Sequence, residues 1–176
     1  MRILSLFLII LCLTGAAPPK EQSKESEIGK WDGFRGIKWG TDLTTIKEMI
    51  KIGTEDFTGY IREDDSKTIG AASVDAITYV TYDNKLGAVA IEASGKVNFS
   101  ALKDAFTERF GEPKKPNEFL EEYVWIGGSS GKMVIIRLTL NMFTQKTLAG
   151  ILYKPMIDEQ ESKSKEKAKA GAEKDF

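Results

Sequence analysis

Histidine is absent from this chain of 176 residues, and cysteine occurs once, at Cys12. Zinc sites built from cysteine and histidine need several of these residues, and the common nucleophile systems pair serine or cysteine with histidine. A structural disulfide needs a second cysteine in the chain. Because these three kinds of site are excluded, we expect a protein that is not an enzyme and that binds neither a metal ion nor a cofactor.

An excess of charge of one sign is also lacking. The chain has 25 Lys and Arg residues and 26 Asp and Glu residues, which gives a formal net charge of −1. Proteins that bind nucleic acid through its phosphates usually present a basic patch and a high isoelectric point. The composition therefore predicts no nucleic-acid partner.

Residues 3–13 form the one long apolar run of the sequence. Arg2 precedes this run and the small residues 14–17 follow it, which is the order of parts in a secretory signal peptide. As a helix the run would be about 16 Å long, roughly half of the ~30 Å hydrocarbon core of a bilayer. We therefore expect residues 1–16 to be a signal peptide and the mature protein, without a stable membrane span, to be periplasmic or secreted.

The expected cleavage point follows Ala16, because Thr14 and Ala16 are small residues at the two positions that a signal peptidase reads. Cleavage after Ala17 is the alternative, although it would place Pro18 next to the scissile bond. A lipoprotein signal would instead use Cys12, but a bulky leucine precedes that residue where such signals have a small one. Lipid anchoring through Cys12 is therefore the less favoured alternative.

Two polar segments enclose the part of the mature chain that can form a core. Residues 17–30 are rich in Lys, Glu and Ser, and residues 157–176 have the same character. Segments with so little to bury are typically flexible. In the second segment Glu159 and Lys163 have the i,i+4 spacing of a helical ion pair, so this tail is expected to be flexible or a frayed helix. Residues 31–156 are predicted to form a single domain.

The first half of this domain has the pattern of a helix followed by three strands. After Gly40, either Thr41 or Asp42 can cap a helix that places Leu43, Ile46 and Ile50 on one face and ends at Gly53. Extended runs follow at residues 57–62, 76–82 and 86–93. Residues 83–85, Asp-Asn-Lys, favour a tight turn, so the last two runs are predicted to form a hairpin.

The second half repeats the pattern. Asn98 is the expected cap of a helix whose Phe99, Leu102, Phe106 and Phe110 share a face, and residues 111–113, Gly-Glu-Pro, end it. Three extended runs come next, at residues 122–126, 132–140 and 147–154. Their alternation of apolar and polar residues is typical of a sheet with one wet side.

Together these patterns predict an α+β fold made of two tandem αβββ units. The expected sheet is mainly antiparallel, has about six strands and carries two helices on one face. Its other face would be exposed and would hold Thr78, Tyr82, Arg137 and Thr139.

Three further groups of residues are candidates for a binding or catalytic site. Trp31, Phe34 and Trp39 could anchor a partner, but an aromatic group of this kind more often covers a core. Residues 63–65, Glu-Asp-Asp, offer too few oxygen ligands for a calcium loop and are expected to be a solvated turn. Glu92 and residues 121–122 could form an acid/base pair, although no spacing brings them together.

Residues 31–41, Trp-Asp-Gly-Phe-Arg-Gly-Ile-Lys-Trp-Gly-Thr, resemble the opening of small exported bacterial α+β proteins, which begin with Phe-x-Gly-Ile-x-Trp/Phe-Gly-Thr before a short helix. Residues 110–113, Phe-Gly-Glu-Pro, followed by Tyr123 and Trp125, are similar to a pattern in the small lipoprotein of the outer-membrane barrel-assembly machinery. That lipoprotein shares its helix-plus-sheet arrangement with β-lactamase inhibitor proteins. Because such families act by binding other proteins, the resemblance implies a protein-binding role.

The sequence thus predicts an exported, non-catalytic module that binds a protein of the cell envelope through the exposed face or the edge of its sheet. One alternative is a carrier of a small apolar ligand held between helices and sheet. A second alternative, a carboxylate-dependent hydrolase, ranks last because the sequence places no two carboxylates in a cleft.

Overall fold

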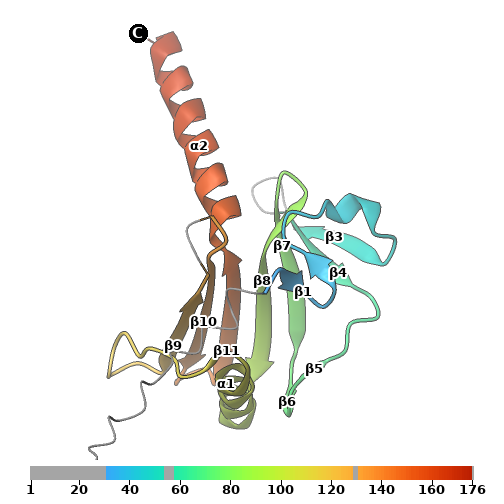
Figure 1. Ribbon diagram of the computed structural model, residues 1–176, viewed down its shortest axis with the longest axis vertical. Coiled ribbons are helices and arrows are strands. Elements are labelled where there is room, and N and C mark those ends of the chain that lie inside the picture. Colours follow the sequence, from blue (N-terminus) through green and yellow to red (C-terminus); the bar gives the residue numbers. More distant parts are fainter. Residues whose placement is uncertain (1–30, 54–57, 129–130, 176) are drawn as a thin grey trace, which may run out of the picture.

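The centre of the fold is a seven-stranded antiparallel sheet with the strand order β3-β4-β7-β8-β11-β10-β9 (Figure 1). The computed structural model describes residues 31–53, 58–128 and 131–175. The predicted signal peptide with Cys12, the predicted cleavage points at Ala16 and Ala17, and the predicted leader up to residue 30 lie outside this part of the chain. The strands of the sheet are β3 (Met49–Gly53), β4 (Thr58–Arg62), β7 (Ala76–Tyr82), β8 (Lys85–Ser94), β9 (Glu122–Gly127), β10 (Val134–Asn141) and β11 (Lys146–Tyr153).

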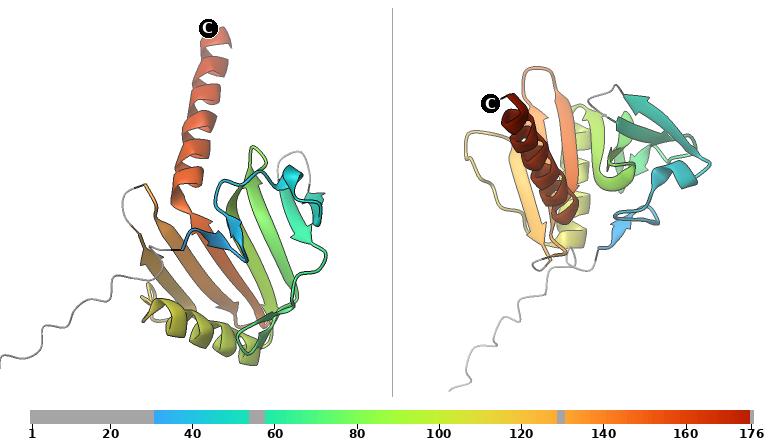
Figure 2. Two further views of the ribbon diagram at one scale, coloured as in Figure 1. Left: turned by 45° about the vertical axis from the view of Figure 1, so that its right-hand side comes forward. Right: turned by 90° about the horizontal axis from the view of Figure 1, so that it is seen from above.

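Two small hairpins and two helices complete the architecture. The hairpins are β1 (Gly33–Phe34) with β2 (Ile37–Lys38), and β5 (Thr68–Ile69) with β6 (Ala72–Ser73). The helices are α1 (Lys96–Phe110) and α2 (Lys154–Asp175), and a short 3₁₀ turn, η2, covers Leu43–Thr45. Figure 2 shows α1 across one end of the strands and α2 leaving the opposite end. No helix of the described ranges is both long and apolar enough to cross a membrane.

The core lies between the sheet and α1. Alternate residues of the central strands are buried on the α1 side, as in β10, where Val134, Ile136, Leu138 and Leu140 are buried while Arg137 is exposed. This period of two follows from the pleat, which turns successive side chains to opposite faces. The predicted α+β class and the predicted antiparallel sheet are confirmed.

The four aromatic and aliphatic residues expected on one face of α1 are all buried: Phe99, Leu102, Phe106 and Phe110. The helix ends as expected at Gly111, whose φ of +83° suits glycine and whose amide donates to Thr107 O. The prediction that Asn98 caps the helix is wrong, because Gly95 occupies that position. Asn98 lies in the first turn, where its Nδ2 donates to Ser94 O at 2.8 Å. Its Oδ1 accepts the Ser73 amide of β6 at 3.0 Å, so this side chain joins α1 to the second hairpin.

The helix expected between Gly40 and Gly53 does not form. Asp42 is an N-cap as expected, since its Oδ1 accepts the Thr44 amide at 2.9 Å. The element that it caps is the short 3₁₀ turn η2 and not a longer helix. Beyond it, Met49–Gly53 pairs along its whole length with β4 as strand β3. Two adjacent threonines and an isoleucine follow the cap, and these β-branched residues lose rotamer freedom in a helix. Pairing with β4 also satisfies backbone groups that an isolated short helix would leave exposed.

This one change alters the predicted topology. The sheet has seven strands instead of about six, and the described chain is not two αβββ units because the first helix is absent. The other predicted strands are present within a few residues of their expected limits, and the β7–β8 hairpin turns at Asp83 and Asn84, both with positive φ. Phe57, the first residue of one expected strand, lies outside the described residues.

Helix α2 follows β11 directly and extends beyond the sheet (Figure 1). It contacts β7, β8 and β11 near its start, where Met156 lies against Gly87. The predicted i,i+4 pair of Glu159 and Lys163 is present at 2.8 Å, and Lys163 also reaches Asp83 in the β7–β8 turn at 2.7 Å. Exposed pairs of this kind stabilise a helix only weakly.

Candidate binding surfaces

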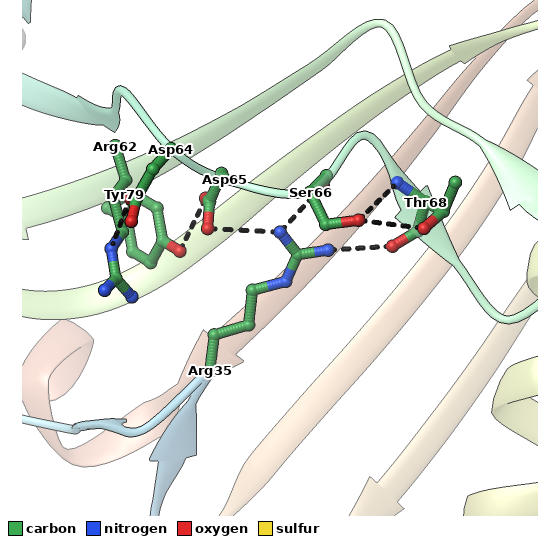
Figure 3. Close-up of polar contacts among 7 residues, drawn as sticks. All are labelled: Arg35, Arg62, Asp64, Asp65, Ser66, Thr68 and Tyr79. Carbon is green, nitrogen blue, oxygen red and sulfur yellow. Dashed lines mark hydrogen bonds and ion pairs between the residues drawn. The ribbon is translucent and has the colours of Figure 1, made fainter.

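Arg35 joins the first hairpin to the loop that follows β4 (Figure 3). Arg35 and Gly36 form the two-residue turn between β1 and β2, with φ values of +47° and +82°. Positive φ at both central residues is typical of the turn type that matches the twist of a hairpin. The guanidinium lies 3.1 Å from Asp65 Oδ1 and donates to Ser66 O at 2.8 Å and to Thr68 O at 2.9 Å.

Asp65 is also bound from the sheet side, where Tyr79 OH donates to its Oδ2 at 2.7 Å. The side chain of Asp65 is only 5% exposed, so the expectation of a solvated turn at residues 63–65 is wrong for this residue. Burial, together with the hydrogen bond to Asp65, raises the pKa of Tyr79. Since the Asp65 carboxylate has donors on both sides, it holds the hairpin against the core.

A cleft of about 830 Å³ opens beside this hairpin, between β1–β2, the β5–β6 turn at Ile69 and Gly70, and the last turns of α1. This volume is within the range of small-molecule sites, ~300–1,000 Å³. Its walls are mostly apolar and include Trp31, Phe34 and Phe106. We call it the aromatic cleft.

Charged groups of both signs stand around the aromatic cleft. Arg109 lies over the rings of Trp31 and Phe110, at 5.8 and 5.6 Å from their centroids. Lys38 is near Asp32, with Nζ and Oδ2 3.7 Å apart and both side chains exposed. The aromatic group expected to cover the core does so: Phe34 is buried, and Trp31 and Trp39 pack against the core from its edge.

The sheet face opposite α1 contains a row of residues without polar side chains, of which Gly59 and Ala88 are buried and Ile126 is exposed. The strand pairing aligns one residue of each of the seven strands: Ile52, Gly59, Val80, Ala88, Leu152, Ile135 and Ile126. We call this side of the sheet the open face. Ile126 and Leu148, both on it, are each 50% exposed. A Cβ atom placed on Gly150 of the same face would meet no atom within 4 Å.

The structure brings three of the four predicted surface residues onto the open face. The register places Thr78, Ala90, Gly150, Arg137 and Val124 in one row, and Thr139 lies one row away, opposite Leu148. Arg137 Nε pairs with Glu122 Oε1 at 3.1 Å. Tyr82 lies at the end of β7, over Gly87 and beside the start of α2, where burial raises its pKa.

Two of the three candidate acid/base carboxylates bind other side chains. Glu122 pairs with Arg137, and Glu121 Oε2 accepts a hydrogen bond from Tyr123 OH at 3.2 Å. Glu92 lies on the open face, opposite Ala76 of β7 and Leu148 of β11. Within the described ranges, no three His, Cys, Asp or Glu side chains are grouped so that they could hold a metal ion.

Comparison of this chain with protein-family models, with curated proteins and with solved structures finds no significant match. The two resemblances noted from residues 31–41 and 110–125 therefore stay expectations. Sequence patterns missed the aromatic cleft, because its walls come from three segments far apart in the chain. They also missed the apolar row, although Leu148 and Leu152 of β11 alternate with buried residues of the opposite face and were a usable signal.

Proposed function

We propose that the protein is an exported, non-catalytic module that binds a protein of the cell envelope on the open face of its sheet. The observation that carries the proposal is the apolar row across all seven strands, on a face that α1 and the hairpins leave uncovered and that the start of α2 contacts only at β7, β8 and β11. Ile126 and Leu148 of this face are each 50% exposed. Contiguous apolar patches on soluble proteins are commonly interaction sites. Export rests on the signal-like order of residues 1–17.

The open face suits a partner whose apolar surface can pack closely against the strands. Thr78, Ala90 and Gly150 are small and adjacent at the centre of the sheet, so a partner backbone can approach closely there. The larger Leu148 and Ile126 lie to either side of this row. The pair of Arg137 and Glu122 is polar and partly exposed, and such groups supply specificity more than affinity.

Site-specific photocrosslinking in the compartment to which the protein is exported tests this proposal. A photoreactive residue in place of Leu148 probes the open face, and one in place of the exposed Ser100 of α1 is the matched control. We expect a saturable adduct with one protein from position 148 and none of that adduct from position 100. Equal adducts from both positions, or adducts only with a second copy of this chain, would contradict the proposal.

Once the partner is identified, its affinity for two lysine variants separates binding from folding. Leu148→Lys places a charge in the contact and should weaken binding at least about tenfold, since half of a leucine side chain is still available for burial. Ser100→Lys introduces the same charge outside the open face and should leave the affinity unchanged. Both variants should unfold at close to the same urea concentration as the parent protein, because Ser100 is exposed and Leu148 is half exposed.

The aromatic cleft supports a second candidate function, the carriage of a small ligand with an apolar body. Its volume and its aromatic walls are the specific observations in favour. Native mass spectrometry of the purified protein should then show a co-purified small molecule. Ala105→Trp would fill the cleft from α1 and should remove that mass, whereas Leu148→Lys should retain it. Absence of any added mass in the parent protein would leave the open face as the better-supported site.

A further inference from the structure

Exposed apolar side chains gather at one end of the molecule. Eight large apolar residues are exposed in the described part of the chain, and five of them lie where α1 begins, in the loop before β9 and in the β10–β11 turn. These five are Val97, Phe119, Leu120, Met142 and Phe143. Phe119 is 95% exposed and Phe143 98%, so neither contributes to the core. We call these residues the apolar tips.

Backbone hydrogen bonds place the three segments side by side. Leu140 N donates to Glu121 O at 2.9 Å, which sets the loop of Phe119 and Leu120 next to the β10–β11 turn. Gly95 N donates to Gln145 O at 2.8 Å, which sets the start of α1 beside the same turn. Figure 1 shows these segments together at the lower end of the sheet, opposite α2. The apolar tips therefore form one end surface.

Both phenylalanines are presented by the same local structure. In residues 117–119, Asn-Glu-Phe, Asn117 Oδ1 accepts the Phe119 amide at 2.9 Å. In residues 141–143, Asn-Met-Phe, Asn141 Oδ1 accepts the amides of Phe143 and Thr144, each at 3.0 Å. The asparagine side chains thus satisfy the backbone donors at each tip and turn the phenylalanine outward.

Two carbonyl groups at the tips also have side-chain donors. Gln145 Nε2 donates to Met142 O at 2.7 Å, and Lys115 Nζ donates to Glu118 O at 3.2 Å. A backbone polar group without a partner is costly to move out of water. Each of these internal bonds lowers the cost of moving the tips into a medium without water.

We propose that the apolar tips dock the protein on a phospholipid surface, with Phe119 and Phe143 entering the boundary between headgroups and acyl chains. The tips protrude separately from turns, which suits insertion into a deformable medium better than contact with a preformed protein surface. Three segments fixed to one rigid sheet can insert together. Lys96, next to Val97, is exposed and can contact headgroup phosphates, while Glu118, next to Phe119, opposes a strong preference for anionic lipid.

This surface is distinct from the open face, so the two proposals are tested separately. The full chain is used with Cys12→Ser, and a single cysteine is introduced by Phe143→Cys to carry an environment-sensitive fluorophore. Vesicles of phosphatidylcholine, alone or mixed with phosphatidylglycerol, are then titrated. Ile50→Cys, labelled in the same way, is the control because Ile50 is exposed on β3, away from the tips.

We expect the fluorophore at position 143 to shift to the blue and to be quenched by a lipid-borne quencher on both kinds of vesicle, and the one at position 50 to stay in water. Phe119→Ser in the labelled protein should weaken vesicle binding about tenfold, as expected for one phenylalanine withdrawn from water, while Ile50→Ser should not. If the apolar run at residues 3–13 alone binds vesicles, position 143 stays in water and the proposal is overturned. An equal response at positions 50 and 143 would overturn it too.

Discussion

The guanidinium of Arg35 lies 3.1 Å from the carboxylate of Asp65, and this ion pair joins the turn of the first hairpin to the loop after β4. The Arg35 side chain is 21% exposed and that of Asp65 only 5%, so the pair is largely removed from solvent. Tyr79 binds the other carboxylate oxygen from the sheet. The contact therefore fixes one wall of the aromatic cleft to the core.

Removing the arginine should destabilise the protein. Arg35→Ala removes the ion pair of Asp65 and leaves its carboxylate with the hydrogen bond from the Tyr79 hydroxyl. Removing one partner of a buried ion pair costs about 3 kcal/mol, because the other charge stays buried. The free energy of unfolding, measured in urea, should fall by about that amount. The control is Lys38→Ala in the same hairpin, whose pair with Asp32 is exposed on both sides and should change stability by less than about 0.5 kcal/mol. Equal effects of the two variants would mean that the burial of Asp65 has no energetic role.

Alkaline pH should destabilise the protein through Tyr79. Its pKa is raised in the folded state by burial and by Asp65, whereas in the unfolded chain it is about 10. The stability contributed by this difference is fully present below about pH 10 and is lost as the pH rises further, because the unfolded state releases the phenol proton first. Tyr79→Phe should reduce the decline above about pH 10 by up to ~1.4 kcal/mol per pH unit, measured by urea unfolding at a series of pH values. A parallel decline in both proteins would assign it to other groups.

Two glycines in strands should respond oppositely to alanine. A Cβ atom on Gly33 would lie 2.0 Å from Ile37 O, so Gly33→Ala must separate β1 from β2 and should cost about 2 kcal/mol or more. Gly150 has open space above it, so Gly150→Ala should be neutral or stabilising by up to about 1 kcal/mol. Thermal unfolding of the two variants compares them. A large loss in Gly150→Ala would show that another part of the chain covers the open face.

Asn98 should matter as a link between elements. Asn98→Ala removes the acceptor of the Ser73 amide and the donor to Ser94 O, and should lower the free energy of unfolding by about 1–2 kcal/mol. Asn98→Asp retains an acceptor for Ser73 but loses the donor, so its loss should be smaller than that of alanine. Amide hydrogen exchange at Ser73 should become faster in the alanine variant and stay slow in the aspartate variant. Unchanged exchange at Ser73 in both would contradict the bridging role.

Those elements whose residue pattern admits one interpretation could be predicted from the amino-acid sequence alone. The spacing of Phe99, Leu102, Phe106 and Phe110 fits only a helix, and the alternation in residues 132–140 fits only a strand with one buried face. The Asp-Asn turn between two such strands also defined the β7–β8 hairpin. These signals are local, because each rests on neighbours within one or two turns of backbone.

Where the local pattern admits two interpretations, contacts with the rest of the fold determine which conformation a segment adopts. Leu43, Ile46 and Ile50 have helical spacing, yet Ile50 and Ile52 also alternate, and the partner strand β4 selected the extended form. Strand order and register determine the burial of Asp65 and the apolar row of the open face. They also determine that the loop of Phe119 lies beside the β10–β11 turn, which holds Phe143. Those properties arise from contacts between residues far apart in the chain, which no local pattern records.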